Sequence, residues 1–449
     1  SLSDRIMSRY GDTPEGMVES CMEFLRICVA ENFTDVVISI KASNTVVMVK
    51  TVRLLVDVME KEGMTFPLHL GVTEAGDGED GRIKSALGIG ALLSDGLGDT
   101  IRVSLSEAPE AEIPVARKLV DYVLLRQEHP YIPGLEAPEF NYLSPERRKT
   151  KAVRNIGGEH VPVVIADRMD GKTEVNPQFT PDYIYAGRAL PEQREEGVEY
   201  ILDADVWQGE AGTWPAFNHA QLPLMGECDA ALKFLFIPYM AQTDEVIACL
   251  KYHPEVVIIS QSNHPNRLGE HRALVHQLMT EGLQNPVVFF QHYAEDDAEN
   301  LQIKSAADMG ALIFDGLCDG IFLFNQGSLS HAVVDATAFG ILQAGRTRTS
   351  KTEYISCPGC GRTLYDLEKT IARIKAATSH LKGLKIGIMG CIVNGPGEMA
   401  DADYGYVGAG RGKISLYKGK VCVEKNIPEE EAVERLLEFI RTDREENQQ

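Results

Sequence analysis

The chain has 449 residues, 44% of them hydrophobic and 24% charged, with a formal net charge of −22. This length suits about two to four globular domains, and the acidic balance excludes the basic face that nucleic-acid binding needs. No apolar run is long enough to cross a bilayer, and residues 1–5 lack the pattern of a secretory signal peptide. Nine scattered cysteines are too sparse for a disulfide framework, so we expect a protein of the cytoplasm or, after import, of a plastid stroma.

The first 125 residues alternate between helical and strand-like patterns. Apolar spacing and helix-start residues predict helices over 13–29, 44–62, 82–94 and 111–125. Short apolar runs predict strands over 35–40, 66–70 and 101–105. Regular β/α alternation implies a parallel sheet with crossover helices, either open or closed into a barrel.

The same order of elements returns about 220 residues later in the chain. Segment 83–86 returns as 303–306, and segment 90–99 returns as 310–319 with most apolar positions kept. A constant offset between two segments rarely persists by chance over about seventy residues, so the pattern predicts a duplicated β/α unit.

The second copy keeps its apolar pattern but loses cations. Lys41 and Arg102 are replaced by Gln261 and Phe322. A copy that keeps its core and loses its charges points to a structural role. We therefore interpret residues 129–345 as an inserted, degenerate β/α barrel-like domain.

The last hundred residues have a different order of elements. Their patterns predict helices over 364–377 and 428–441 and strands over 384–389, 413–417 and 420–424. We interpret this region as a compact α+β module.

Three cysteines of this module carry a metal-binding pattern. Cys357-Pro358-Gly359-Cys360 is a C-x-x-C pair, and Cys391 follows in the Gly-rich segment 390–398. Three thiolates can hold three irons of a four-iron, four-sulfur cluster, and Glu398, beyond a Gly-Pro-Gly turn, is a candidate for the fourth. A weak carboxylate ligand could exchange for a substrate oxygen, which favours redox catalysis over electron storage. A zinc site or a redox dithiol is the alternative, although zinc normally draws a second cysteine pair.

Polar side chains of the first segment are candidates for binding an anion. Arg102 lies inside a predicted strand, where an anion is the usual partner of an arginine. Lys41 and Asn44 end another strand. Lys84 opens a helix after a Gly-rich loop, which suits a phosphate, although an ordinary surface lysine is an equally good reading. Glu112 opens the next helix, where stabilisation of the helix dipole is the better reading from the residues alone.

Two separated regions, about 1–125 and 345–449, resemble the 4-hydroxy-3-methylbut-2-enyl diphosphate synthase family of the non-mevalonate isoprenoid pathway. The segments that carry the resemblance are 41–44, 67–76, 84–86, 98–105, 357–360 and 390–398. The inserted copy resembles the long form of the family, which occurs in plants and some bacteria.

The resemblance implies an α/β protein of three domains. Residues 1–128 would be the C-terminal part of a catalytic (β/α) barrel of the TIM type, whose N-terminal part is missing before Ser1. Residues 129–345 would be the inserted structural barrel, whose front part, 155–250, mirrors that missing material. Residues 346–449 would be the α+β iron–sulfur domain.

The resemblance also implies roles for single residues. Cys357, Cys360 and Cys391 would bind a 4Fe-4S cluster, with Glu398 as an exchangeable ligand of the fourth iron. Glu112 matches a family residue assigned to acid chemistry, which reverses the reading from the residues alone. The groups that would hold or approach a substrate diphosphate are Lys41, Ser43, Asn44, Lys84, Arg102, Arg346 and Arg348.

The implied reaction is the two-electron reductive ring opening and dehydroxylation of 2-C-methyl-D-erythritol 2,4-cyclodiphosphate, with ferredoxin or flavodoxin as electron donor. The substrate in the barrel mouth must reach the cluster. The two domains must therefore face each other within one chain or across a homodimer, which is the assembly we expect. The competing hypothesis is a non-catalytic redox sensor or zinc-stapled binding protein, which predicts no turnover and no need for Lys84 or Arg102.

Overall fold

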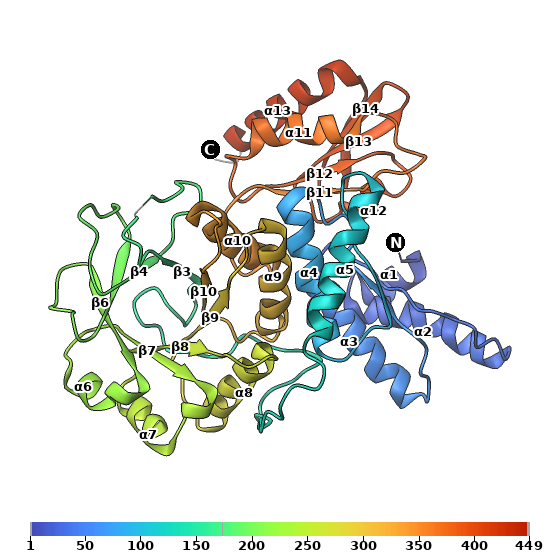
Figure 1. The fold of residues 1–449 in the computed structure, drawn as a ribbon. Helices are drawn as coiled ribbons and strands as arrows, with labels where there is room; N and C mark the ends of the chain where they lie inside the picture. Colours follow the sequence, from blue (N-terminus) through green and yellow to red (C-terminus); the bar gives the residue numbers. More distant parts are fainter. Residues whose placement is uncertain (1, 173, 447–449) are drawn as a thin grey trace. The chain divides into compact units, whose positions relative to one another are not determined.

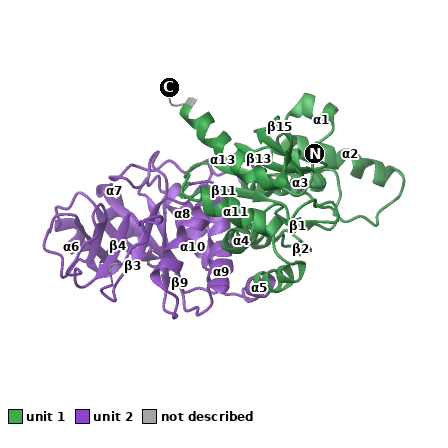
Figure 2. Cartoon of the chain, turned by 90° about the horizontal axis from the view of Figure 1, so that it is seen from above, with its two compact units in different colours: residues 1–119, 349–449 green, residues 120–348 purple. Residues whose placement is uncertain are grey.

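A computed structural model describes residues 2–172 and 174–446 of the chain (Figure 1). The chain divides into two compact units: unit 1 combines residues 1–119 with 349–449, and unit 2 comprises residues 120–348 (Figure 2). The predicted domain boundaries at 128/129 and 345/346 stay a prediction. Within the described ranges, no helix has both the length and the apolar character that spanning a membrane requires.

The amino-terminal part of unit 1 is rich in helices. Its elements are α1 (Asp4–Tyr10), α2 (Pro14–Ala30), α3 (Thr45–Lys61), β1 (His69–Gly71), α4 (Gly78–Ser94), β2 (Thr100–Arg102), the 3-10 turn η1 (Pro109–Ala111) and α5 (Glu112–Leu124), whose end belongs to unit 2. The four predicted helices are confirmed. Local sequence explains their starts: Thr13 caps α2 by accepting a hydrogen bond from the Gly16 N–H, and Pro14 occupies the first turn.

The strands of this part are shorter than the sequence predicts. β1 and β2 pair in parallel over three residues each. The predicted strand over 35–40 is wrong, because this segment makes only one parallel bridge, from Ile38 to Leu68. The side chain of Val37, beside that bridge, is 61% exposed, so the segment lies at an uncovered edge rather than inside a sheet.

The carboxy-terminal part of unit 1 is a five-stranded mixed sheet in the order β11-β12-β13-β14-β15. Its elements are β11 (Glu353–Ser356), α11 (Leu367–Thr378), β12 (Lys385–Met389), α12 (Gly395–Glu398), β13 (Tyr404–Gly410), β14 (Lys413–Lys418), β15 (Val421–Pro428) and α13 (Glu429–Glu446). The first three strands run parallel, and the last two add antiparallel pairs. Ile374 of α11 and Leu436 of α13 are buried in the core cluster that this part forms.

The two parts of unit 1 are joined by direct contacts. Ala75, which follows β1, forms a parallel bridge with Ser356 at the end of β11. The hydroxyl oxygens of Ser106, which follows β2, and Ser356 are 2.7 Å apart. Lys84 of α4 forms a buried ion pair of 3.0 Å with Glu353 of β11. The carboxyl ends of β1 and β2 therefore lie beside the carboxyl end of β11.

Unit 2 is a closed barrel of parallel strands in the order β10-β3-β4-β5-β6-β7-β8-β9 (Figure 1). The strands are β3 (Val163–Asp167), β4 (Tyr183–Gly187), β5 (Glu199–Asp203), β6 (Thr213–Asn218), β7 (Lys233–Pro238), β8 (Val256–Gln261), β9 (Val287–Tyr293) and β10 (Gly320–Asn325). The helices are η2 (His219–Gln221), α6 (Leu222–Glu227), η3 (Tyr239–Ala241), α7 (Asp244–Tyr252), α8 (Arg267–Thr280), α9 (Ala298–Phe314) and α10 (His331–Ala344). Ile165, Tyr183 and Phe234 fill its interior with other apolar side chains. The predicted inserted α/β barrel is confirmed.

The two copies of the predicted repeat share the same internal bonds. Arg53 of α3 forms an ion pair of 2.8 Å with Asp95, which follows α4. Arg272 of α8 forms an ion pair of the same length with Asp315, which follows α9. Each copy also has an aspartate directly before its last strand that accepts a hydrogen bond from a backbone N–H. Asp99 accepts from Leu68 in the first copy, and Asp319 accepts from Val287 in the second. The duplication in the sequence is thus present in the fold.

Candidate active site

The three motif cysteines lie at one edge of the sheet in unit 1. Cys357 directly follows β11, Cys360 lies in the next turn, and Cys391 follows β12 after one residue. β11 and β12 are parallel neighbours, with Ser356 opposite Ile388, so their carboxyl ends meet at the same place. The topology therefore gathers cysteines that are far apart in the sequence.

Backbone N–H groups point at two of the thiols. The Gly390 N–H donates to the Sγ of Cys357 at 3.3 Å, and the Arg362 N–H donates to the Sγ of Cys360 at 3.4 Å. Burial raises the pKa of the Cys357 thiol, whereas the hydrogen bonds from Arg362 lower the pKa of the exposed Cys360 thiol. Bonds of this kind stabilise thiolates and tune metal–sulfur sites.

Two glycines allow the chain to pack tightly around Cys391. A Cβ on Gly408 of β13 would lie 2.3 Å from the carbonyl oxygen of Gly390. A Cβ on Gly390 would lie 2.8 Å from the Oγ1 of Thr363, which also accepts a hydrogen bond from the Cys360 N–H at 2.9 Å. Glycine is therefore required at both positions for the two cysteine loops to approach each other.

Glu398 ends α12 on the same side as the thiols. Its backbone oxygen accepts a hydrogen bond of 3.5 Å from the Ser43 hydroxyl. A hydrogen bond with Cys360 and the charges of Cys360, Cys391 and Glu398 raise the pKa of Arg362, so all three groups lie within electrostatic range of this arginine. The donor set of three thiols and one carboxylate fits a four-iron, four-sulfur cluster.

Within residues 2–172 and 174–446, no three His, Cys, Asp or Glu side chains gather closely enough to hold a single ion. A cavity of about 280 Å³ lies beside Cys360 and is lined also by Ser106 and Thr363.

Lys41 and Arg102 form a pair of cations at the carboxyl ends of the strands. The side chain of Lys41 crosses Gly71 of β1, where a Cβ would lie 2.9 Å from its Cε. Burial and the charge of Arg102 lower the pKa of Lys41, and burial and both cations lower the pKa of His69. Neither cation forms an ion pair with a carboxylate in the described part of the chain. Two adjacent cations without a carboxylate ion pair are suited to an anion.

Three other predicted site residues of unit 1 already have protein partners. Lys84 is buried in its ion pair with Glu353. The Asn44 side chain caps α3 by accepting hydrogen bonds from the N–H groups at positions 46 and 47. Glu112 accepts a hydrogen bond of 3.0 Å from the Leu105 N–H. These contacts give each of the three a structural role in unit 1.

The two arginines before the cluster module belong to unit 2. Arg348 forms an ion pair of 2.5 Å with Asp182, which precedes β4, and lies over the ring of Phe339. Arg346 adopts a left-handed backbone conformation with φ of 58°. Their predicted contact with a diphosphate stays a prediction.

The sequence interpretation missed Glu74. This residue follows β1 by three positions, is 5% exposed, and has a left-handed φ of 48°. Burial raises the pKa of its carboxyl to about 7; a hydrogen bond from Thr73 opposes this shift, and the charge of Glu398 adds to it. Its Oε2 has no hydrogen-bond partner in the described part of the chain. Its place in a loop after a parallel strand was the available signal.

Comparisons with known proteins bear on this site. Residues 1–117 match the GcpE TIM-barrel domain family, and residues 353–442 match the GcpE protein C-terminal domain family. A protein of Bacteroides thetaiotaomicron, named 4-hydroxy-3-methylbut-2-en-1-yl diphosphate synthase (flavodoxin), is 95% identical over 446 residues, which cover 99% of this chain and 73% of the relative. The chain belongs to the 4-hydroxy-3-methylbut-2-enyl diphosphate synthase family.

More distant family members carry the same name. The protein of Chlorobaculum tepidum is 41% identical over 98% of this chain and 68% of its own length. The protein of Leptospira interrogans is 38% identical over 98% of this chain and 73% of its own length. The resemblance predicted from the two motif regions is thus confirmed, and each region overlaps one of the family matches.

Proposed function

We propose that this chain reduces 2-C-methyl-D-erythritol 2,4-cyclodiphosphate to 4-hydroxy-3-methylbut-2-enyl diphosphate in isoprenoid biosynthesis. One ring C–O bond to the diphosphate breaks, one hydroxyl leaves as water, and a C=C bond forms. Two electrons and two protons balance the reaction when the freed phosphate oxygen is counted as protonated. The observation that carries the proposal is the adjacent pair of Lys41 and Arg102, which make no carboxylate ion pair in the described part of the chain, in the unit that holds the three thiols.

The residues of unit 1 would hold both the cofactor and the substrate. Cys357, Cys360 and Cys391 would hold a 4Fe-4S cluster with Glu398 at the fourth iron, and the cluster would supply single electrons and a Lewis-acidic iron. Lys41 and Arg102 would bind the diphosphate, because its charge would replace the carboxylate partners that they lack. Contact between the Ser43 hydroxyl and the Glu398 backbone supports a short path from one site to the other.

The proton donor would be Glu74 rather than Glu112. A general acid is most effective when its pKa lies near the working pH, and burial holds the pKa of Glu74 at about 7. Glu112 instead accepts a backbone hydrogen bond at the start of α5. Glu74→Gln should lower turnover by about 100-fold or more, and Glu112→Gln by far less. The reverse order would return the acid role to Glu112.

The electron donor would be flavodoxin, or ferredoxin in its place. The names of the relatives specify flavodoxin for those proteins. The homodimer implied by the resemblance stays a prediction.

The decisive experiment is anaerobic purification with iron and sulfide analysis and a visible spectrum. Cys391→Ser should remove the cluster chromophore, whereas Cys422→Ser, in β15, is the matched control and should keep it. The intact chain should also convert the cyclodiphosphate when reduced flavodoxin is supplied. A colourless protein with one bound zinc would contradict the proposal.

A further inference from the structure

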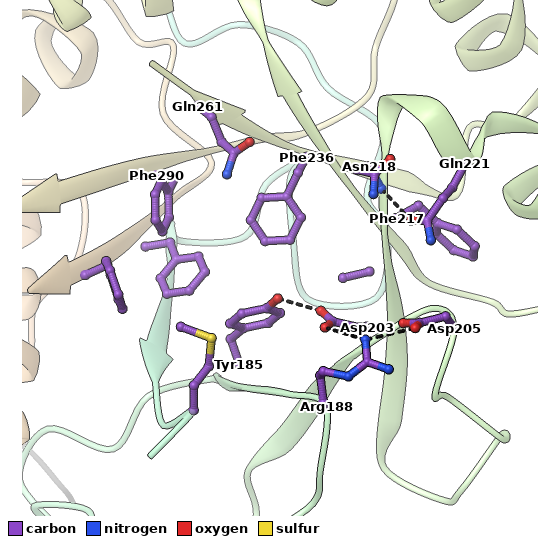
Figure 3. Close-up of a pocket in the computed structure, with 14 residues that line it drawn as sticks. Tyr185, Arg188, Asp203, Asp205, Phe217, Asn218, Gln221, Phe236, Gln261 and Phe290 are labelled. Atoms are coloured by element: carbon purple, nitrogen blue, oxygen red, sulfur yellow. Dashed lines mark hydrogen bonds and ion pairs between the residues drawn. The ribbon is translucent and has the colours of Figure 1, made fainter. Parts of the chain in front are cut away.

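Unit 2 holds a cavity of about 480 Å³ that the proposed reaction does not use. It lies at the mouth of the closed barrel, where Tyr185 of β4, Asp203 of β5, Phe236 of β7 and Phe290 of β9 line it (Figure 3). Barrels of parallel strands bind their ligands at this carboxyl end. The volume suits a small organic molecule.

The floor of this mouth is aromatic. Phe290 packs edge-on against Phe322, with ring centroids 4.9 Å apart, and stacks on Phe324 at 5.8 Å. Tyr185 contacts Phe236 and Phe322, each at 5.7 Å. Aromatic faces attract apolar groups and, through the ring quadrupole, cations.

One side of the rim carries carboxylates. Asp203 accepts a hydrogen bond of 2.6 Å from the Tyr185 hydroxyl. Arg188 spans the two acids of this rim, 2.8 Å from Asp205 and 3.9 Å from Asp203 (Figure 3). The Arg188 side chain is 66% exposed, so water screens these ion pairs and they are weak. Two carboxylates against one arginine leave the rim with one negative charge in excess.

A third carboxylate lies close to the same hydroxyl. Burial, the hydrogen bond to Asp203 and the charges of Asp203, Asp167 and Asp205 raise the pKa of Tyr185. Asp167 ends β3 and is itself partly buried, which raises the pKa of its carboxyl. The acidic character of this side is therefore shared by the ends of β3 and β5.

The second copy also lacks the cations that the first copy offers to a diphosphate. Gln261 and Phe322 line this mouth at the repeat positions of Lys41 and Arg102. A site that lacks both cations and carries an acidic rim is unsuited to the anion proposed for the first copy. Its charge favours a ligand of the opposite sign.

We propose that the mouth of the unit 2 barrel binds a small organic cation, with an ammonium group carried on an apolar or aromatic body. The body packs on Phe236 and Phe290, and the ammonium group takes the place of Arg188 between Asp203 and Asp205. The weak, exposed ion pairs of Arg188 make it a displaceable occupant of that position. The proposed site does not depend on the proposed reaction, because every residue that forms it belongs to unit 2.

Three probes of similar shape test the charge of the ligand. Phenethylamine, phenethyl alcohol and 3-phenylpropionate are cationic, neutral and anionic, and each is titrated calorimetrically into the full chain. The amine should bind, the alcohol should bind at least about tenfold more weakly, and the acid should not bind. Equal binding of amine and alcohol, preference for the acid, or no binding of the amine in the low-millimolar range would overturn the proposal.

Variants then test where the amine binds. Arg188→Gln should tighten amine binding, because it removes the competing cation, whereas an anion-binding site would lose affinity. Asp205→Asn should weaken amine binding by at least about fivefold. Asp229→Asn makes the same charge change at an exposed position before β7, at the other end of the barrel, and should leave the affinity unchanged. Weaker amine binding by Arg188→Gln, or equal effects of Asp205→Asn and Asp229→Asn, would show that the amine binds elsewhere. Melting curves check that each variant is folded.

Discussion

At the scale of single residues, Glu74 combines features that cost folding free energy. Its carboxyl is buried, one of its oxygens has no hydrogen-bond partner in the described part of the chain, and its backbone has a positive φ of 48°. Non-glycine residues in this backbone region cost on the order of 1–3 kcal/mol, and such strain clusters at functional sites. Burial of an acid beside Glu398 adds to that cost. The position of Glu74 is therefore better explained by chemistry than by stability.

The stability of the iron-free chain should depend on pH through Glu74. Its folded-state pKa of about 7 lies above the ordinary value of 4.5, so the folded state binds this proton more tightly. The resulting stabilisation is full below pH 4.5 and is lost as the pH rises through about 7. The side chain in Glu74→Gln does not titrate. As the pH rises from about 5 to about 8, the free energy of unfolding of this variant should therefore increase by on the order of 3 kcal/mol relative to that of the unchanged chain. Urea unfolding at both pH values measures this gain, with Glu112→Gln as the control; a gain independent of pH would contradict it.

The cations of unit 1 should separate into two functional classes. Lys41→Ala together with Arg102→Ala should abolish binding of the cyclodiphosphate with little change in melting temperature, because neither cation has an ion-pair partner in the described ranges. Lys84→Met should instead lower stability by about 3–5 kcal/mol, because it leaves Glu353 buried without its lysine. Substrate titrations and chemical unfolding of both variants measure the difference. If Lys84→Met lost as much substrate binding as the double variant and kept its stability, Lys84 would be a diphosphate ligand.

At the scale of elements, the repeated pairing of two helices offers an internal comparison. The side chains of Arg53 and Asp95 are 0% and 2% exposed, whereas the side chain of Arg272 in the matching pair is 22% exposed. Removing one partner of a fully buried ion pair costs about 3–5 kcal/mol, and water reduces that cost when a partner is accessible. Arg53→Met should therefore destabilise the chain more than Arg272→Met does. Unfolding curves of both variants measure the order, and a larger effect of Arg272→Met would contradict it.

The elements also show how far the sequence could be interpreted. Helices α2 to α5 were predictable because capping residues and apolar spacing agree, as at Thr13 and Pro14. β13 was missed because it reads Tyr-Gly-Tyr-Val-Gly-Ala-Gly, and glycine is uncommon in strands. Its glycines serve close packing instead, as at Gly408 against Gly390. Contacts with distant parts of the chain, which a local sequence pattern does not contain, therefore determine that this segment forms a strand.

The candidate site residues also differ in whether local sequence or long-range contact reveals them. The cysteines and Glu398 could be predicted as candidate cluster ligands because of their spacing in the sequence, and these roles stay predictions. Glu74 could not be predicted, because its burial and its nearness to Glu398 arise only when β1 and β11 meet in the folded unit. The sequence predicted Lys84 as a diphosphate ligand and gave no sign of its ion pair with Glu353, which lies 269 residues away in the chain. Long-range pairing is the information that one sequence does not supply.

At the scale of the whole molecule, unit 2 closes its own barrel from residues 120–348. All eight of its strands pair with one another, so a fragment of residues 120–348 should fold alone and melt cooperatively. A fragment of residues 1–119 should not, because β1 and β2 form only a two-stranded sheet, and helix α4 depends on Glu353 through Lys84. Circular dichroism melts of both fragments measure this contrast. A cooperative melt of the shorter fragment would show that unit 1 does not need its second half.

The interrupted chain path of unit 1 has a consequence for synthesis on the ribosome. Residues 120–348 must be made between its first part and the strand that carries Glu353. At about 5–20 residues per second, this delay is on the order of 10–50 s. During that time Lys84 and Ser106 lack their partners Glu353 and Ser356, while the barrel that follows them in the chain can already close. The nascent chain thus exposes the unfinished first part of unit 1 for longest, and chaperones would be needed there before they are needed at the barrel.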